Sequence, residues 1–312
     1  MTKRKLNPPS GSQGQLPFES PDEPDLRILP FEQARNLIRQ QAVTQSTLPL
    51  MRMNPPDIMG VNNLYADFDR YLHLRQKEWF EGPAEFLVRI HLGDEHLILL
   101  RHGGEAVTFT RGDETHRIEQ GEIIGHLTHK ATGRITQQEA EEVSEAIREE
   151  LGVPSAEAMS RVYDRIRGLV PPRWDTVEAR DFRPRENPRV GFLVYTEVDD
   201  KVAGMRMVDS LTSAALTEMH DVLGFRYAFA YGRMVGLDGK YQTPAQAARH
   251  LNQELMIRDE HGISLYPSVA FHQRAGATVA CGMPNCALDD RSINQGFLAW
   301  YDLEELKRRG RL

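Results

Sequence analysis

Residues 265–302 read LYPSVAFHQRAGATVACGMPNCALDDRSINQGFLAWYD, and this stretch decides the fold that we predict. It opens with a short helical segment around Phe271 and His272. Two apolar runs follow, Thr278 to Cys281 and Phe297 to Tyr301, and a long polar loop separates them. Short apolar runs bounded by turn residues are typical of buried strands. The stretch therefore predicts a helix, a strand, a long loop and a closing strand.

Composition limits the classes of function. The chain has 312 residues, 40% hydrophobic and 27% charged, as in soluble proteins of one large or two modest domains. Its formal net charge of -7 argues against nucleic acid or an anionic membrane as a partner. No apolar run approaches the roughly 20 residues of a membrane span, and the basic start lacks the apolar region of a secretory signal. We therefore expect a cytoplasmic protein.

Four segments divide the chain in our prediction. Residues 1–24 are rich in Pro, Ser, Gly and charge, which predicts a disordered arm. Residues 25–170 form a helical and antiparallel β region, a divergent N-terminal lobe. The charged, Pro-rich residues 171–188 form a linker loop, and 189–312 form a C-terminal lobe. No internal repeat is apparent.

The first part of the N-terminal lobe alternates helix and loop. A short strand is predicted over 26–28, and helices over 31–43 and 63–80, because apolar residues recur there at helical spacing. The Pro-containing segment 44–60 between them is predicted to be loop.

From residue 84 to 130 the apolar period changes to two. Gly-containing turns separate the runs, which predicts a meander of antiparallel strands. A metal-binding jelly roll would also be rich in strands and histidines, but no H-x-H pair with a suitably spaced Glu is present. His126 and His129 are three apart, which places them on opposite faces of a strand. Cys281 and Cys286 are expected to be reduced thiols rather than metal ligands, and we expect no metal.

The second half of the chain predicts a β-α-β unit. Capping signals at Thr136 and Ser155 introduce two helices, over 135–151 and 156–169. The run Val190 to Val198 predicts a central, buried strand. A helix over 207–224 and a strand over 225–234 follow, and a crossover of this length predicts that the two strands are parallel. A helix over 243–255, with Thr243 as its N-cap, precedes the opening stretch.

This unit and the tail together resemble the Gcn5-related N-acetyltransferase (GNAT) superfamily, over about residues 188–302. The tail is similar to that of the GNAT-like domains that load starter units on polyketide assembly lines, which reads FH-x-x-x-GA, then a Pro-containing loop, then YD. The resemblance implies an α/β (α+β) fold: a GNAT-like mixed central sheet flanked by helices, with a strand-rich, mainly antiparallel N-terminal half.

The same resemblance implies an acyltransferase that acts on an acyl thioester, in specialised metabolite biosynthesis. Its substrate would be coenzyme A or a phosphopantetheine thioester. Its partners would be a small-molecule acyl donor, an unknown acceptor and an acyl carrier protein. In the superfamily, a loop of type Q/R-x-x-G-x-G/A after the central strand binds the pyrophosphate through backbone N–H groups.

This chain departs from the family in that loop. The assembly-line relatives read QGLGLGDQLL where this chain reads AGMRMVDSLT, so Gly204 and Asp209 match while Arg206 and Val208 replace glycines. Two interpretations stay open. Phosphate binding is altered, with Lys201, Arg206 and the backbone of Gly204 contributing, or the chain is a non-catalytic GNAT-fold binding module that has lost CoA binding.

The resemblance also implies candidate catalytic residues. Thr128 in GHLTHK is similar to the Thr of the family's G-x-L-Y-T-Q-R segment, while residues 170–189 lack the family's His. Tyr195 and Thr196 lie on the central strand, where they would face an acyl carbonyl or only pack the strand. His272 matches the tail motif, as a catalyst or as a polar support for the closing strands.

Other functions have less support in the sequence. The motifs G-x-S-x-G, G-x-x-x-x-G-K-[ST] and H-E-x-x-H are missing from the chain. A third possibility is a β-barrel in residues 84–130 that binds a ligand on its own.

Overall fold

The fold is described here from a computed structural model, which covers residues 27–46, 95–132, 134–173, 190–286 and 289–312. The arm predicted over 1–24, the helix predicted over 63–80, the part of the predicted meander before residue 95 and most of the 171–188 linker lie outside these ranges.

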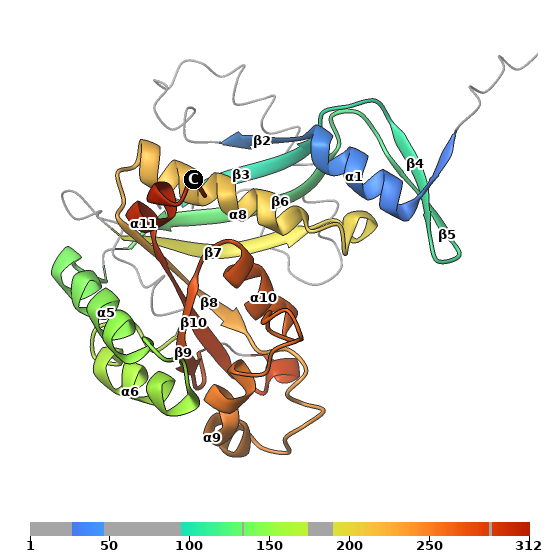
Figure 1. The fold of residues 1–312 in the computed structure, drawn as a ribbon. Coiled ribbons are helices and arrows are strands. Elements are labelled where there is room, and N and C mark those ends of the chain that lie inside the picture. Colours follow the sequence, from blue (N-terminus) through green and yellow to red (C-terminus); the bar gives the residue numbers. More distant parts are fainter. Residues whose placement is uncertain (1–26, 47–94, 133, 174–189, 287–288) are drawn as a thin grey trace, which may run out of the picture.

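A seven-stranded mixed sheet forms the centre of the molecule (Figure 1). Every neighbouring pair is antiparallel except β7 and β8, which are parallel as the β-α-β unit predicts. The predicted fold class is confirmed. In spatial order the strands are β2 (Ala42–Ser46), β3 (Glu95–His102), β6 (Ile123–Ala131), β7 (Val190–Val198), β8 (Tyr227–Arg233), β10 (Gly296–Asp302) and β9 (Thr278–Met283).

A second, three-stranded sheet corrects the predicted meander. It consists of β1 (Ile28–Pro30), β4 (Val107–Arg111) and β5 (Glu114–Ile118), and β3 pairs directly with β6. The hairpin β4–β5 leaves the main sheet because it buries its apolar face elsewhere: the Phe109 ring lies 6.2 Å from that of Phe31 in helix α1 (Phe31–Gln41). The described strands of 84–130 therefore belong to two sheets and form no barrel.

Strand β2 also differs from the prediction. The sequence predicts helix to residue 43 and loop from 44, but Ala42–Ser46 pairs antiparallel with β3. Strand pairing outweighs the helical pattern here, because Val43 and Thr44 are β-branched and suit a pleated edge.

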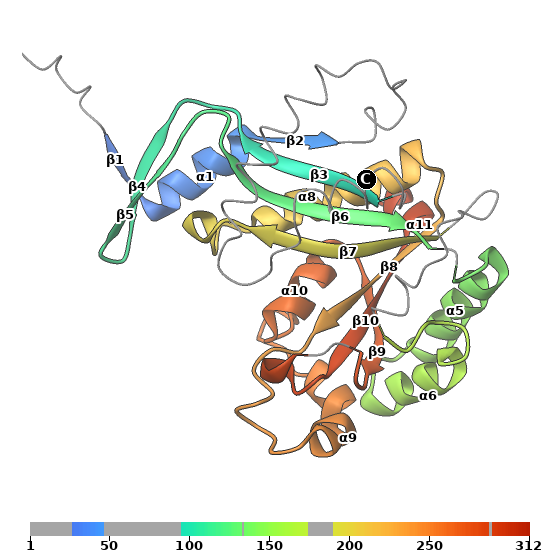
Figure 2. The same ribbon diagram turned by 180° about the vertical axis from the view of Figure 1, so that it is seen from behind.

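Helices cover both faces of the sheet (Figures 1 and 2). Asp209 and Arg274 join helices α8 (Met207–Thr217) and α10 (Pro267–Arg274) on one face. The other face carries α5 (Gln137–Glu150), α6 (Ala156–Ile166) and α9 (Pro244–Leu255).

The caps at Thr136, Ser155 and Thr243 form as predicted. The remaining helical elements are η1 (Asp200–Val202), the π-helical turn η2 (Glu218–Val222), η3 (Asp290–Ser292) and α11 (Leu303–Arg308).

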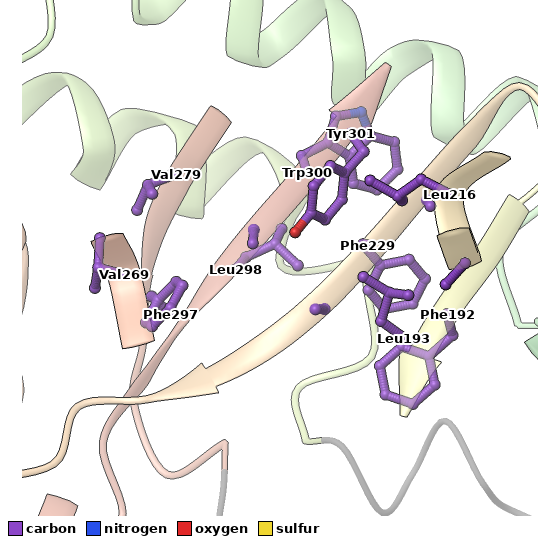
Figure 3. Packing of buried hydrophobic residues seen from close by; sticks show 14 of the residues in the cluster. Phe192, Leu193, Leu216, Phe229, Val269, Val279, Phe297, Leu298, Trp300 and Tyr301 are labelled. Atoms are coloured by element: carbon purple, nitrogen blue, oxygen red, sulfur yellow. The ribbon is translucent and has the colours of Figure 1, made fainter. Parts of the chain in front are cut away.

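The core lies between these layers (Figure 3). Successive residues of β10 point to opposite layers: Trp300 Nε1 donates to Ser144 Oγ of α5 at 2.8 Å, and the Tyr301 hydroxyl meets His272 Nδ1 of α10 at 2.5 Å. The Phe229 ring stacks on Trp300 with centroids 6.0 Å apart and lies 5.0 Å from Phe192. Aromatic packing thus ties β7, β8 and β10 together.

Strand β7 is central but only half buried. Val190 to Leu193 are buried, as the apolar run predicts, whereas Tyr195 is 42% exposed and its neighbours are partly exposed. A strand fourth in a seven-stranded sheet is normally covered on both sides. Tyr195 and its neighbours are exposed because β7 pairs with β8 only at its start. The unpaired part of these two strands defines the candidate site.

Candidate functional site

Strands β7 and β8 separate after a short paired segment. Only Val190–Phe192 pairs with Tyr227–Phe229, although β7 continues to Val198 and β8 to Arg233. Figures 1 and 2 show the two strands diverging from this point. The pairing of β7 with β6 and of β8 with β10 continues along both strands. The sheet therefore opens at its only parallel pair among the described strands.

Aromatic side chains fill the narrow end of this opening. The Tyr231 ring lies 5.9 Å from Phe192 and 5.6 Å from Phe229. Its hydroxyl donates a hydrogen bond to the carbonyl of Pro171. Burial raises the pKa of Tyr231 far above its usual value, so the phenol stays protonated. The apolar narrow end leads to the more exposed, polar part of β7.

The loop between β7 and α8 carries unsatisfied backbone donors. Gly204 and Arg206 both have left-handed backbone conformations, with φ of 82° and 62°. The N–H groups of Gly204, Arg206, Met207 and Val208 donate to no acceptor within the described residues. Because the first N–H groups of a helix have no intrahelical partner, this end of α8 suits an anion.

Arginine side chains surround the same helix end. Arg206 Nε and Arg274 Nε donate to one oxygen of Asp209, at 2.9 and 3.1 Å, and Arg274 Nη2 donates to the other at 3.1 Å. Arg311 Nη1 donates to the backbone carbonyl of Arg274 at 3.4 Å. Two guanidinium groups, of Arg206 and Arg274, thus share the carboxylate of Asp209, which leaves positive charge at the N-terminus of α8.

The other residues predicted to bind the cofactor have different surroundings. Lys201 Nζ pairs with Glu122 Oε1 at 2.5 Å, so its charge is directed to the strand side of the loop. Val208 lies half-buried in the first turn of α8, where its carbonyl accepts from Thr212. The structure brings Gly204, Arg206 and Asp209 together and holds Lys201 apart from them.

Polar side chains gather on one face of β6 and β7. Thr128 lies opposite Tyr195 in the strand register, and His126 lies opposite Glu197. The Tyr195 hydroxyl donates to Glu197 Oε2 at 3.3 Å, and the His126 and Tyr195 rings lie 5.6 Å apart. His126 and Thr128 are buried while Tyr195 is exposed, so the group reaches the surface at Tyr195.

Two members of this group, His126 and Glu197, were not predicted from the sequence as site residues. His126 is two residues from Thr128 and Glu197 is two from Tyr195, which places each pair on one strand face. That spacing was a signal, but only the register between β6 and β7 shows that the four side chains meet.

Two predicted catalytic residues lie outside this group. Thr196 Oγ1 donates to the carbonyl of His126 at 3.2 Å, and alternation along the strand turns it away from Tyr195. His272 is buried in α10 against the Phe297 ring and bonds Tyr301. Burial lowers the pKa of His272 to about 3, so the ring is neutral near pH 7. This geometry favours a supporting role for His272.

A buried ionic cluster lies on the α8 face of the same strands. Glu218 Oε1 meets His129 Nε2 at 2.9 Å and lies 3.9 Å from His96 Nδ1. The two imidazole rings stack with centroids 5.1 Å apart. His126 and His129 thus lie on opposite faces of β6, as their spacing predicts.

Metal ligands, disulfides and membrane spans are the remaining features of the described part of the chain. It contains no group of three or more His, Cys, Asp or Glu side chains arranged to hold a metal ion. Cys281 and Cys286 are buried thiols without a disulfide. Among the helices described, none has the length and apolar character to cross a membrane.

Solved structures provide the comparison with known proteins. No protein-family model and no curated protein sequence matches this chain. Malonyl-CoA decarboxylase from Rhodopseudomonas palustris matches 89% of this chain with a TM-score of 0.53 and 10% identity, and this chain spans 62% of its length. The loading GNATL domain of CurA from Lyngbya majuscula matches with a TM-score of 0.44 and 16% identity, over 77% of this chain and 95% of that domain. The GphF GNAT-like decarboxylase in complex with isobutyryl-CoA matches with a TM-score of 0.42 and 16% identity, over 77% and 96%.

Identities this low bear on the fold alone. The mixed sheet, the parallel pair that opens beside the N-terminus of α8 and the closing antiparallel strands β9 and β10 agree with the resemblance found in the sequence. The chain shares its fold with the malonyl-CoA decarboxylase.

Proposed function

We propose that this protein is an acyltransferase that acts on an acyl thioester, carried by coenzyme A or by a carrier-protein phosphopantetheine arm. The observation that carries the proposal is the separation of β7 and β8 beside the N-terminus of α8. A thioester arm is long and thin, and it needs an extended channel that ends next to a phosphate site. The fold shared with malonyl-CoA decarboxylase supports an acyl-CoA donor.

The loop and its arginines would bind the diphosphate. The unsatisfied N–H groups of Gly204 and Val208 and the positive end of the α8 dipole favour an anion at this position. Arg206 can turn from Asp209 towards a phosphate, because Arg274 would remain paired with that carboxylate. Arg206 would thereby supply by charge what the family's glycines supply through close backbone approach.

The polar group on β6 and β7 would perform the transfer. An acceptor attacks the thioester carbonyl carbon as its proton passes to the Glu197 carboxylate, while the Thr128 hydroxyl donates to the oxyanion. The carbon–sulfur bond then breaks, and the leaving thiolate takes the proton of Tyr195. The 3.3 Å hydrogen bond between Tyr195 and Glu197 allows the carboxyl group to reprotonate the phenol.

A binding and turnover screen tests this proposal. The full chain would be assayed with acetyl-, malonyl- and long-chain acyl-CoA, and with an acylated carrier protein, for thermal shift and for release of thiol. We expect at least one donor to raise the melting temperature and to be consumed. Neither a shift nor turnover with any donor would overturn the proposal.

A second function has one observation in its favour. Arg206 and Val208 stand where the assembly-line relatives have glycine, and Val208 adds a branched side chain at the phosphate position. A GNAT-fold module that binds a ligand or partner without catalysis would tolerate both. Binding of CoA without turnover, unchanged by Tyr195→Phe, would favour this function over transfer.

A further inference from the structure

The loop between β7 and α8 is held by a hairpin from the second sheet. Arg111 is the last residue of β4, and its Nη1 donates to the carbonyl of Asp200 at 2.7 Å and to that of Ala203 at 3.2 Å. We propose that Arg111 is a positioning residue that keeps this loop in the conformation that binds the diphosphate of an acyl-CoA. The proposal rests on the function proposed above and names a residue outside the GNAT-like core.

Peptide geometry explains how Arg111 acts at a distance. In a trans peptide the C=O and the following N–H point in opposite directions. Because the Ala203 carbonyl is directed at Arg111, the N–H of Gly204 is directed away from the hairpin. Gly204 is exposed and has φ of 82°, a conformation with little intrinsic preference to persist. The external bond to Ala203 supplies the constraint that the glycine lacks.

Other contacts make the hairpin a rigid support. Phe109 of β4 packs against Phe31 of α1, and a Cβ added at Gly204 would lie 3.8 Å from the Phe31 ring. The sheet β1–β4–β5 and α1 therefore approach the loop as one block. From the main sheet, the carbonyl of Ile124 accepts from the Asp199 N–H at 2.9 Å. The loop is thus fixed between the hairpin and the strands β6 and β7.

The charge of Arg111 adds to its geometry. The structure gives this guanidinium only backbone carbonyls as partners within the described residues, and no carboxylate. Its positive charge therefore lies beside the loop without a salt bridge to any described residue. A planar guanidinium can also hold two carbonyls at once, which a single ammonium does with less defined direction.

The test separates loop positioning from general stability. Arg111→Ala and Arg111→Lys would be titrated by calorimetry with CoA and with pantetheine, which has the same arm but lacks the diphosphate. We expect Arg111→Ala to weaken CoA binding about tenfold and to leave pantetheine binding within twofold, since two hydrogen bonds to a charged donor are lost. Arg111→Lys should retain part of the affinity. Arg117→Ala is the matched control, because Arg117 lies on the neighbouring strand β5 and pairs only with Glu119 in the described structure.

Each outcome decides a different question. If the wild type binds CoA and Arg111→Ala binds it equally well, or loses CoA and pantetheine to the same extent, the positioning role is wrong. If the wild type binds neither compound, the inference is wrong, and the donor screen, which includes an acylated carrier protein, decides the proposed function separately. Should Arg111→Ala fail to fold, the ratio of CoA affinity to pantetheine affinity can be measured in Arg111→Lys and Arg111→Gln instead.

Discussion

Removal of the buried carboxylate of Glu218 should destabilise this protein strongly. Glu218 is 8% exposed at the start of the π-helical turn after α8, and it joins that turn to His129 of β6 and His96 of β3. Breaking a buried pair by removing one partner costs about 3–5 kcal/mol, because the other partner stays buried without compensation. We therefore expect Glu218→Ala to lower the free energy of unfolding by about 3 kcal/mol or more.

The pH dependence of stability provides a second measure of the same cluster. Burial alone would raise the pKa of Glu218, but hydrogen bonds from His129 and Ser46 and the charges of His129 and His96 hold it below its usual value of 4.5. A carboxyl whose pKa is lower in the folded state stabilises the fold above the unfolded-state pKa. That contribution is lost as the pH falls through the folded-state pKa. In Glu218→Gln the free energy of unfolding should therefore fall less steeply than in the wild type as the pH drops below about 4.5.

Urea unfolding of wild type, Glu218→Ala and Glu218→Gln between pH 3 and 8 measures both effects. Glu141→Gln is the control, since Glu141 forms an exposed pair with Arg226 at 3.0 Å and should matter by less than about 1 kcal/mol. If Glu218→Ala unfolds within 1 kcal/mol of the wild type at pH 7, the buried cluster does not stabilise the fold as we argue.

Three further predictions concern the candidate site and its support. Arg206→Gly should be more stable than Arg206→Ala by about 1 kcal/mol in urea unfolding, because only glycine adopts φ of 62° without strain; equal stabilities would contradict this. Tyr195→Phe should slow thiol release by about 10²-fold at unchanged melting temperature, since the proposed mechanism assigns proton transfer to the exposed hydroxyl; an unchanged rate would remove Tyr195 from the mechanism. His272→Gln should reduce the loss of stability between pH 6.5 and about pH 3 by the contribution of residue 272, because only the unfolded chain binds a proton there, and should leave turnover intact. A lost turnover with a native melting temperature would restore His272 as a catalyst.

Local signals predicted much of this fold. The capping box at Thr136 and Glu139 and the Pro-initiated helix after Thr243 depend on neighbours in sequence, and they form as predicted. The parallel pairing of β7 and β8 followed from the crossover length. These features are decided within a few dozen residues, so one sequence is enough to find them.

The pairing between strands that are distant in the chain could not be predicted from the sequence. The meander was expected because Gly turns separate the runs, yet β4 pairs with β1, from the beginning of the chain, and packs against Phe31. The grouping of His126 with Tyr195 likewise depends on the register of β6 with β7 across an insertion that contains α5 and α6. The contact of Arg111 with the carbonyl of Ala203 has no sequence pattern, because any backbone carbonyl can accept it.

The conformation of Arg206 bears on the two interpretations of the loop. Left-handed backbone costs a residue with a side chain about 1–2 kcal/mol, and glycine is the usual solution. In this chain an arginine, Arg206, adopts the conformation, with φ of 62° and ψ of 31° at the N-cap of α8. Strain of this kind persists where the surrounding structure imposes it, and it gathers at functional sites. Here the Arg206 side chain bonds Asp209, while the N–H groups of Met207 and Val208 have no acceptor among the residues that the structure describes. A loop that had merely lost phosphate binding could relax to an ordinary backbone. The strained backbone at Arg206 therefore favours the first interpretation as our proposal: an anion site with altered partner groups.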